Sequence, residues 1–492
     1  MTRSEKKAFK IASRHLNVVP DYLALYEIIA GNKNKNIDSI KAEFLKERKG
    51  ASYDTSVKYL YKIILKTILD LRKEQDSYFS LLNGIMKAKI LFEKSLLEEC
   101  FALLNRIIEE SERLENHYTL MLASRLEIEY LLTLNFASID EKSLLNKHFR
   151  INKTLRAIMK VNEQSSIYDL LKYRLISKGN VRSAEQKVEL NDLVVSEISI
   201  ISSSNLESFE INKLHQLFQA NYLISVGDYK SAFRSFSELN RLFENNKHLW
   251  NNPPIYYLQT VEGVLDSLRG IRNYEGMKYF VEQLDKLESQ SINFKENVNS
   301  LIFLYDLFPS LDRGDFAASM AHLNGNMKTL FNKLQLLSLN RQAELFLYAS
   351  LVYFTNRKYK EAHRYINRII LLQGKELYYL PLYRTIRLAN LMILYELKDF
   401  DLIKYETRSF KREIKTAEKG YNIEKTMLRF LNNRNIIYKK GKRDAIWEEI
   451  SAELEANIND VFEHQVLKIF DFTAWMESKI TKIPLAKIMA LR

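Results

Sequence analysis

Apolar residues recur every three or four positions along nearly the whole chain, which is the spacing of one buried face of an α-helix. This pattern predicts a helical protein with loops at the short polar clusters that interrupt it, at residues 31–36, 202–205, 251–254 and 439–443. Near the N-terminus it predicts four helices, over about 4–15, 20–30, 37–48 and 53–74. Near the C-terminus, the strongly apolar stretch 466–476 predicts one further helix.

A second pattern repeats on a longer scale. A loop residue is followed by an aromatic or large apolar residue and, three positions later, by a small or apolar one. Six copies occur: Leu97…Cys100, Tyr229…Ala232, Tyr274…Met277, Phe316…Ser319, Tyr359…Ala362 and Phe400…Ile403. From Tyr229 the copies are 45, 42, 43 and 41 residues apart, and the gap of 132 residues after Leu97 equals three steps of 44. Degenerate copies near Phe136 and Val181…Ala184 are candidates to fill that gap. A period of this size is typical of stacked helical hairpins.

The two clearest copies, residues 227–236 and 358–366, resemble the G-x-Y-x-x-A-x-x-x-F segment of tetratricopeptide (TPR) repeats. In that pattern the aromatic residue begins the second helix, the small residue lets the two helices approach, and the residue four further on packs onto the next hairpin. The resemblance implies about eight antiparallel hairpins stacked into a right-handed superhelix. We therefore expect an all-α protein: a helical N-terminal module at 1–80, an α-solenoid of TPR-like hairpins at 81–440, and C-terminal capping helices at 441–492.

The opening residues 2–10 and the closing stretch 470–480 are similar to those of a family of uncharacterised bacterial TPR-like proteins. This resemblance implies a bacterial, cytoplasmic setting and no particular activity.

The composition fits the helical expectation, because 13 Gly and 6 Pro are too few for the closely spaced turns of an all-β or α/β fold. The single cysteine, Cys100, excludes an intrachain disulfide and favours a reducing compartment.

The chain also lacks the signals of export or membrane insertion. No apolar signal-peptide core follows the charged N-terminus. The longest apolar run, about residues 345–354, is too short to span a bilayer. We therefore expect a cytoplasmic protein that makes no contact with a membrane.

Positive charge is concentrated near the N-terminus. The formal net charge is +13, and residues 1–75 alone hold 16 Lys and Arg against 9 Asp and Glu. The basic run at 439–443 is a second concentration, interpreted as an exposed loop. A charge excess of this kind attracts acidic segments or phosphate groups without fixing the fold.

The last two helices of the N-terminal module, with a turn at Gly50 between them, have the proportions of a helix-turn-helix. The second of these helices carries a basic stripe at i, i+4 and i+8, formed by Lys58, Lys62 and Lys66. Leu60 and Tyr61 are expected in the core. The stripe is the candidate contact for a partner or for a phosphate backbone, and the simpler interpretation is a solvated face of a packed helix.

Motifs that carry chemistry are missing from the sequence. It contains no phosphate-binding G-x-x-x-x-G-K-S/T or G-x-G-x-x-G, and no H-E-x-x-H, paired C-x-x-C or EF-hand loop. The eight histidines are isolated from one another in sequence. Cys100 stands where the repeat places a small residue, which favours a buried, inert thiol. We therefore expect no enzyme activity, no cofactor and no metal.

Two functions are compatible with these observations. The first is a non-enzymatic scaffold or adaptor that binds a protein or peptide in the groove of its repeat array. The second is a transcriptional or nucleic-acid-binding regulator that joins a helix-turn-helix-like module at 1–80 to a ligand-sensing array, an architecture suggested by analogy alone. Capture of one protein partner favours the first, and a salt-dependent shift of nucleic acid favours the second.

Overall fold

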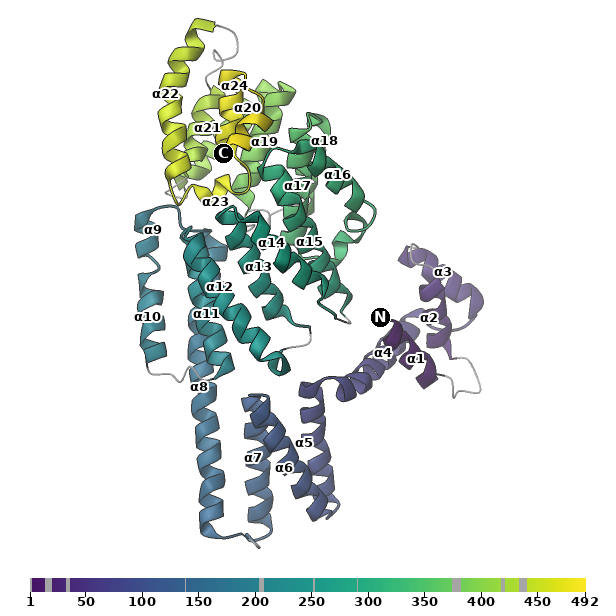
Figure 1. The fold of residues 1–492 in the computed structure, drawn as a ribbon. Coiled ribbons are helices and arrows are strands. Elements are labelled where there is room, and N and C mark those ends of the chain that lie inside the picture. The colour runs from purple at the N-terminus through teal and green to yellow at the C-terminus, as the bar shows by residue number, and fades with distance from the viewer. Residues whose placement is uncertain are drawn as a thin grey trace. The chain divides into compact units, whose positions relative to one another are not determined.

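The computed structural model describes residues 2–13, 20–31, 36–137, 139–202, 208–250, 253–289, 291–373, 382–416, 421–432 and 440–492. Within these ranges all regular structure is helical and no strand occurs. Helices that follow one another in the chain pack against one another in turn (Figure 1). The expected all-α class is therefore confirmed. Parts of the expected loops, residues 32–35, 203–205, 251–252 and 439, lie outside the described residues.

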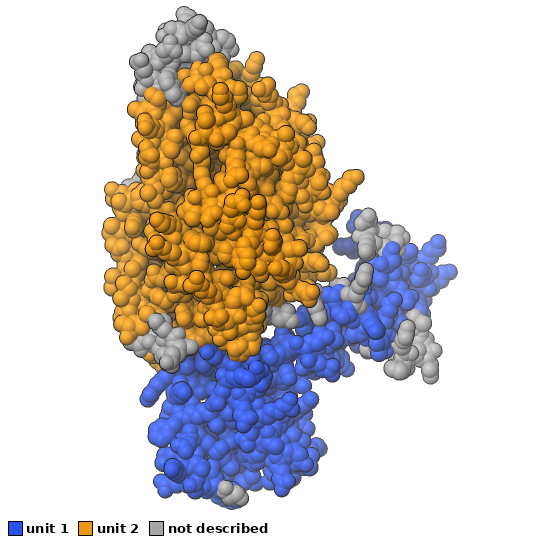
Figure 2. All heavy atoms as spheres, in the orientation of Figure 1, with its two compact units in different colours: residues 1–158 blue, residues 159–492 orange. Residues whose placement is uncertain are grey.

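The chain divides into two compact units, residues 1–158 and 159–492, which Figure 2 shows in blue and orange. The division falls within the long helix α8. The helices of unit 1 are α1 (Arg3–Ser13), α2 (Asp21–Gly31), α3 (Ile37–Glu47), α4 (Tyr53–Gln75), α5 (Ser77–Glu93), α6 (Leu97–Arg113), α7 (His117–Thr133) and the first half of α8 (Glu141–Lys178). The four helices expected near the N-terminus are confirmed as α1 to α4, within two residues at each end that the structure describes.

Unit 1 is built around two separate cores. In the first, α1 to α4 bury Phe9, Leu25 and Phe44 completely. In the second, α5 to α7 close around Cys100 and Leu104, which are equally buried. The Cys100 thiol donates a hydrogen bond to the Ala88 carbonyl oxygen at 3.2 Å. Burial raises its pKa, which disfavours the reactive thiolate.

Unit 2 holds one continuous core that runs from the second half of α8 to the C-terminal helices. Its helices are α9 (Ala184–Val188), α10 (Asn191–Ser202), α11 (Phe209–Ser225), α12 (Tyr229–Asn245), α13 (Ile255–Gly270), α14 (Tyr274–Asp285), α15 (Ile292–Asp312), α16 (Phe316–Asn326), α17 (Leu339–Thr355), α18 (Tyr359–Gln373), α19 (Tyr383–Leu397), α20 (Phe400–Thr416), α21 (Asn422–Asn432), α22 (Lys440–Asn459), α23 (His464–Leu467), α24 (Phe472–Thr481) and α25 (Leu485–Leu491). Short 3₁₀ turns, η1 (Lys247–Leu249) and η2 (Phe331–Leu336), follow α12 and α16.

The six copies of the sequence repeat mark six helical hairpins. In every copy the large residue is the first residue of a helix, as in α12 at Tyr229 and α14 at Tyr274. The residue two positions before it is left-handed, with φ between 57° and 81°, in all six turns. The next residue donates its backbone N–H to the carbonyl five positions earlier, as in Asn273 to Leu268 at 2.9 Å. These are the marks of a Schellman-type helix end followed directly by a new helix.

The packing that the repeat predicts is also found. The small or apolar residue three positions after the helix start is buried in every copy, and Ala232 and Ala362 are fully buried. Phe236, four residues after Ala232, packs onto the next hairpin: a Cβ atom added at Gly263 of α13 would lie 2.3 Å from its ring. Tyr229 approaches α13 just as closely, because a Cβ atom added at Gly270 of that helix would lie 2.3 Å from the Tyr229 ring. The repeat register gives Tyr359 the same position as the buried Tyr229 and predicts that it is buried too, but Tyr359 is half-buried.

Three sequence expectations about where helices begin and end are wrong. Neither degenerate copy begins a hairpin helix, because Phe136 lies in a left-handed turn and residues 181–184 lead only into the five-residue α9. Residues 440–443 form the first turn of α22 instead of a loop, since Lys and Arg are good helix formers and one glycine costs only about 1 kcal/mol. The stretch 466–476 is not one helix: α23 ends at Leu467, and α24 starts anew at Phe472 because Asp471 caps its N-terminus.

Candidate functional site

The C-terminal segment of unit 2, here residues 458–492, lies against the turns of three successive hairpins, α11–α12, α13–α14 and α15–α16. At the α11–α12 turn, a Cβ atom added at Gly227 would lie 2.6 Å from the backbone oxygen of Val461. At the α15–α16 turn, a Cβ atom added at Gly314 would lie 2.5 Å from the backbone oxygen of Ala486. Both glycines also have φ near +80°. The backbone conformation therefore favours glycine at these two turns, and the close approach of the segment leaves no room for a side chain.

Further contacts fix this segment to unit 2. The Gln465 side-chain amide donates to the backbone carbonyls of Val181 and Ser225, each at 3.0 Å. The Glu463 carboxylate accepts the backbone N–H groups of Asn422 and Ile423 at the start of α21. The C-terminal segment therefore packs against residues of unit 2 that lie much earlier in the chain.

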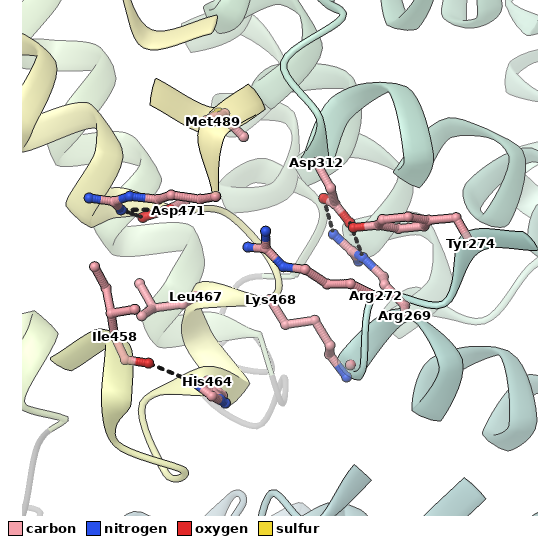
Figure 3. Close-up of a pocket in the computed structure, with 12 residues that line it drawn as sticks. Arg269, Arg272, Tyr274, Asp312, Ile458, His464, Leu467, Lys468, Asp471 and Met489 are labelled. Carbon is pink, nitrogen blue, oxygen red and sulfur yellow. Dashed lines mark hydrogen bonds and ion pairs between the residues drawn. The ribbon is translucent and has the colours of Figure 1, made fainter. Parts of the chain in front are cut away.

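Between the two glycine turns lies the α13–α14 turn, and there a cavity of about 410 Å³ separates the segment from the hairpins. Figure 3 shows side chains from both sides of it. The hairpins contribute Arg269, Arg272, Tyr274 and Asp312, and the C-terminal region contributes Ile458, His464, Leu467, Lys468, Asp471, Met489 and Arg492. Basic side chains thus outnumber acidic ones on its wall.

One wall of the cavity is a buried ion pair. Arg269, only 3% exposed, donates from two nitrogens to the two oxygens of Asp312 at 2.9 Å each. It also donates to the Tyr348 hydroxyl at 2.8 Å, and its guanidinium lies 3.5 Å from the centre of the Phe308 ring. Burial acts to lower the pKa of Arg269, but the neighbouring carboxylate and hydroxyl outweigh it and raise the pKa above its ordinary value.

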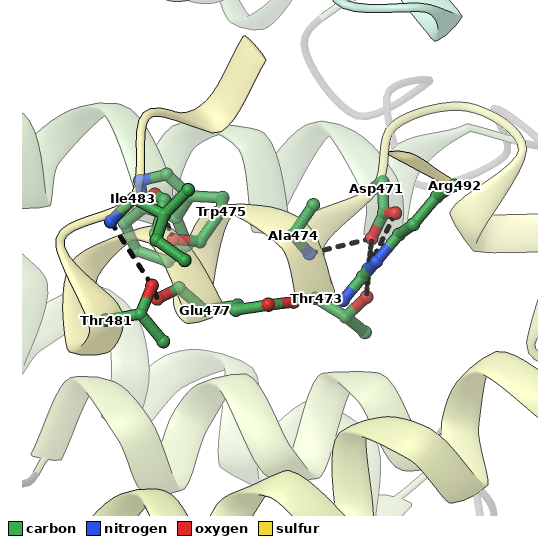
Figure 4. Close-up of polar contacts among 9 residues, drawn as sticks. Asp471, Thr473, Ala474, Trp475, Glu477, Thr481, Ile483 and Arg492 are labelled. Atoms are coloured by element: carbon green, nitrogen blue, oxygen red, sulfur yellow. Dashed lines mark hydrogen bonds and ion pairs between the residues drawn. The ribbon is translucent and has the colours of Figure 1, made fainter. Parts of the chain in front are cut away.

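Two other cations of the wall have carboxylate partners as well. The Lys468 ammonium donates to both oxygens of Asp266, at 2.7 and 2.8 Å. Burial lowers the pKa of Lys468, but Asp266 and Tyr229 together raise it above its ordinary value, so the group stays charged. Arg492 donates to both oxygens of Asp471 and also pairs with Glu477 (Figure 4). Asp471 in turn caps α24 by accepting the backbone N–H of Ala474 at 2.8 Å.

Arg272 differs from these cations. It is exposed, and within the part of the chain that the structure describes it has no hydrogen bond or ion pair to a carboxylate. Figure 3 shows its side chain extending from the α13–α14 turn into the space between Asp312 and Asp471. Among the described lining residues, Arg272 is therefore the one arginine or lysine side chain without a carboxylate partner.

The residues predicted to bind a partner lie in unit 1, on α4. Lys58, Lys62 and Lys66 are exposed, and no ion pair involves them among the described residues. Leu60 is buried as expected. Tyr61, also expected in the core, is 68% exposed, because α4 turns only one side toward α1 and α2 and Tyr61 lies outside it.

The exposed side of α4 is therefore a mixed surface, here named the α4 stripe. It consists of Val57, Lys58, Tyr61, Lys62, Leu65, Lys66 and Leu69. Its apolar members are four residues apart, which places them in one row on a helix, and the lysines form the adjacent row. All four apolar side chains are at least 39% exposed. The structure thus keeps the predicted lysines together and adds an apolar row that sequence reasoning had placed partly in the core.

The described residues contain no group of three or more metal-ligating side chains. No helix among them is both long enough and apolar enough to cross a bilayer. Comparison of the chain with protein-family models, with curated proteins and with solved structures finds no match.

Proposed function

We propose that the chain is an α-solenoid of TPR-like hairpins in a right-handed superhelix, with a helical N-terminal module and C-terminal capping helices. The six hairpins with the same turn, the same helix start and a buried small or apolar residue at the same position support this arrangement. The packing of Phe236 onto the next hairpin supports it further, because stacked repeats bury their faces against their neighbours.

We propose that this solenoid is a non-enzymatic scaffold or adaptor in a bacterial cytoplasm, and that the α4 stripe binds an acidic, amphipathic segment of another protein. The observation that carries this proposal is that an exposed apolar row lies beside a row of lysines on one helix, and that these lysines have no ion pair among the described residues. Exposed apolar rows rimmed by charge mark interaction sites on soluble proteins.

The two rows have complementary roles in such binding. Leu65 and Tyr61 are 53% and 68% exposed, and full burial of one such side chain contributes roughly 1.5–3 kcal/mol. The lysines attract carboxylates, increase the association rate and select acidic partners. An amphipathic helix with apolar residues at i and i+4 and acidic residues beside them matches both rows.

Reversing the three lysines is expected to abolish most of this binding. In the full-length chain, Lys58→Glu, Lys62→Glu and Lys66→Glu together should weaken capture of the protein partner about tenfold to a hundredfold and flatten its salt dependence. Helicity and thermal stability should hardly change, because all three side chains are exposed. Affinity capture from native cells, followed by binding measurements with the identified acidic segment, provides the measurement.

A matched control changes the same amount of charge in the same module. Lys6→Glu, Lys7→Glu and Lys10→Glu alter three exposed lysines of α1. If this control weakens capture as much as the α4 variant does, net charge and not the α4 stripe governs binding. If capture survives the α4 reversal, the lysines are a solvated face and the scaffold must bind elsewhere.

The second candidate function is a nucleic-acid-binding regulator. It is favoured by one observation: the unpaired lysines lie on the second helix of the α3–α4 pair, after a turn in which Gly50 has φ of +91°. For this function, full-length protein should shift nucleic acid in a salt-dependent way. The lysine reversal should then abolish the shift, whereas Tyr61→Ser with Leu65→Ser should leave it intact. The protein-binding proposal predicts that both variants lose the partner.

A further inference from the structure

The cavity at the α13–α14 turn is a feature that the scaffold proposal does not use. It lies where the C-terminal segment leaves the hairpin ends, between its close contacts at Gly227 and Gly314. Its volume of about 410 Å³ falls within the range of about 300–1,000 Å³ that is usual for small-molecule sites. The space therefore lies between two fixed contacts and is large enough for a small ligand.

The charges on the wall leave a single site for an anion. Arg269, Lys468 and Arg492 are each engaged by a carboxylate of this chain. Arg272 is not engaged, and its side chain extends into the cavity (Figure 3). A ligand with one negative charge would balance this guanidinium, while a dianion would bring a second charge that no free cation of the described wall could match.

The turn itself does not require arginine at position 272. The equivalent left-handed position is Ser95, Gly227, Gly314, Arg357 or Lys398 in the other five hairpins. Only the α13–α14 copy lines the cavity between the segment and the hairpins. The identity of the side chain at this position therefore matters for what occupies the cavity.

Besides Tyr274 and His464, the remaining wall has three aliphatic side chains. Ile458 of α22, Leu467 of α23 and Met489 of α25 each line the cavity. Ile458 and Leu467 are half-buried and are therefore in part accessible to a ligand. A guanidinium together with an aliphatic wall matches a molecule that has one carboxylate and a short apolar chain.

We propose that this cavity binds a small aliphatic monocarboxylate, with its carboxylate on Arg272 and its chain against Ile458, Leu467 and Met489. A carboxylate accepts two parallel hydrogen bonds from one guanidinium, which gives a charge-assisted contact of defined geometry. The site uses none of the residues of the α4 stripe, so it stands or fails independently of the scaffold function.

Calorimetric titration of the full-length protein tests this assignment. Hexanoate is expected to bind with saturable heat, and Arg272→Gln should weaken its binding about tenfold or more, because a charge-assisted hydrogen bond is lost. Arg357→Gln is the matched control, since Arg357 is exposed and holds the same turn position outside the cavity. It should bind hexanoate like the unchanged protein.

Two further probes and one variant separate the alternatives. Inorganic phosphate should bind more weakly than hexanoate, and hexylamine, which has the chain without the anion, should not bind. Ile458→Trp should block the apolar side and reduce hexanoate binding without removing Arg272. The assignment is overturned if hexanoate does not bind, if Arg272→Gln and Arg357→Gln bind it equally, or if phosphate binds as tightly as hexanoate.

Discussion

Asp312→Ala is expected to destabilise unit 2 by about 3–5 kcal/mol, because it removes the carboxylate partner of the buried Arg269 and leaves that arginine charged. Arg269 is 3% exposed, and its bidentate contact to Asp312 is the only carboxylate contact that the structure gives it. Tyr348 would still accept one hydrogen bond from Arg269, but it carries no compensating charge. Urea denaturation followed by circular dichroism provides the measurement.

Two variants define the origin of that loss. Asp285→Ala removes an exposed aspartate at the end of α14 in the same repeat, and should change stability by no more than about 0.5 kcal/mol. Arg269→Met combined with Asp312→Leu removes both charges and should recover much of the loss, because no buried charge is left unpaired. A midpoint for Asp312→Ala that equals the midpoint for Asp285→Ala would contradict the buried pair.

Gly227→Ala is the second change for which we expect a large effect, of about 2–5 kcal/mol. Part of this cost is conformational, because residue 227 has φ of +81°. The rest is steric: the new Cβ atom would lie 2.6 Å from the backbone oxygen of Val461, and a backbone cannot move aside as a flexible side chain can. Hydrogen exchange should therefore become faster across residues 461–492, where the C-terminal segment is fixed.

Gly50→Ala separates the two causes. Gly50 also has a positive φ, but a Cβ atom there would meet nothing within 4 Å. This variant should carry only the conformational cost of about 1–2 kcal/mol and should leave exchange in residues 461–492 unchanged. If Gly227→Ala costs no more than Gly50→Ala and leaves that exchange unchanged, the contact with Val461 does not hold the segment.

The hairpin register could be predicted from the sequence because two strong local signals coincide in the clearest copy, residues 227–236. A turn that ends one helix and starts the next needs a left-handed residue and an N-cap, such as Gly227 followed by Asp228. The close approach of two helices needs a small residue, such as Ala232. Both constraints act within ten residues, so the sequence carries them directly.

The errors arise where contacts between distant residues decide the outcome. Phe136 resembles a repeat residue, but the 38-residue α8 follows it and no standard hairpin forms there. The run 466–476 has helical periodicity, yet Asp471 within it is the N-cap of α24. Lys468 in the same run forms an ion pair with Asp266, which lies 202 residues earlier. The two charged residues inside an apolar run were the available signal for this break.

The two candidate sites differ in the same way. The basic row of the α4 stripe lies on one helix, so its spacing is visible in the sequence, although the exposure of Tyr61 depends on which side of α4 the other helices cover. The cavity joins residues 269–312 to residues 458–492. No periodicity links two such segments, so this site could only be found from the fold.

Photo-crosslinking from position 61 tests the central claim most directly. A photoreactive aromatic residue replaces Tyr61 of the full-length protein in native cells, and the crosslinked peptide is identified by mass spectrometry. The same residue at position 118 is the control, because Tyr118 is 64% exposed on α7 and lies outside the α4 stripe. We predict a crosslink from position 61 to an acidic, amphipathic protein segment, which is lost when Lys58, Lys62 and Lys66 are changed to Glu. Crosslinks to nucleic acid alone, or the same products from both positions, would contradict the proposed scaffold function.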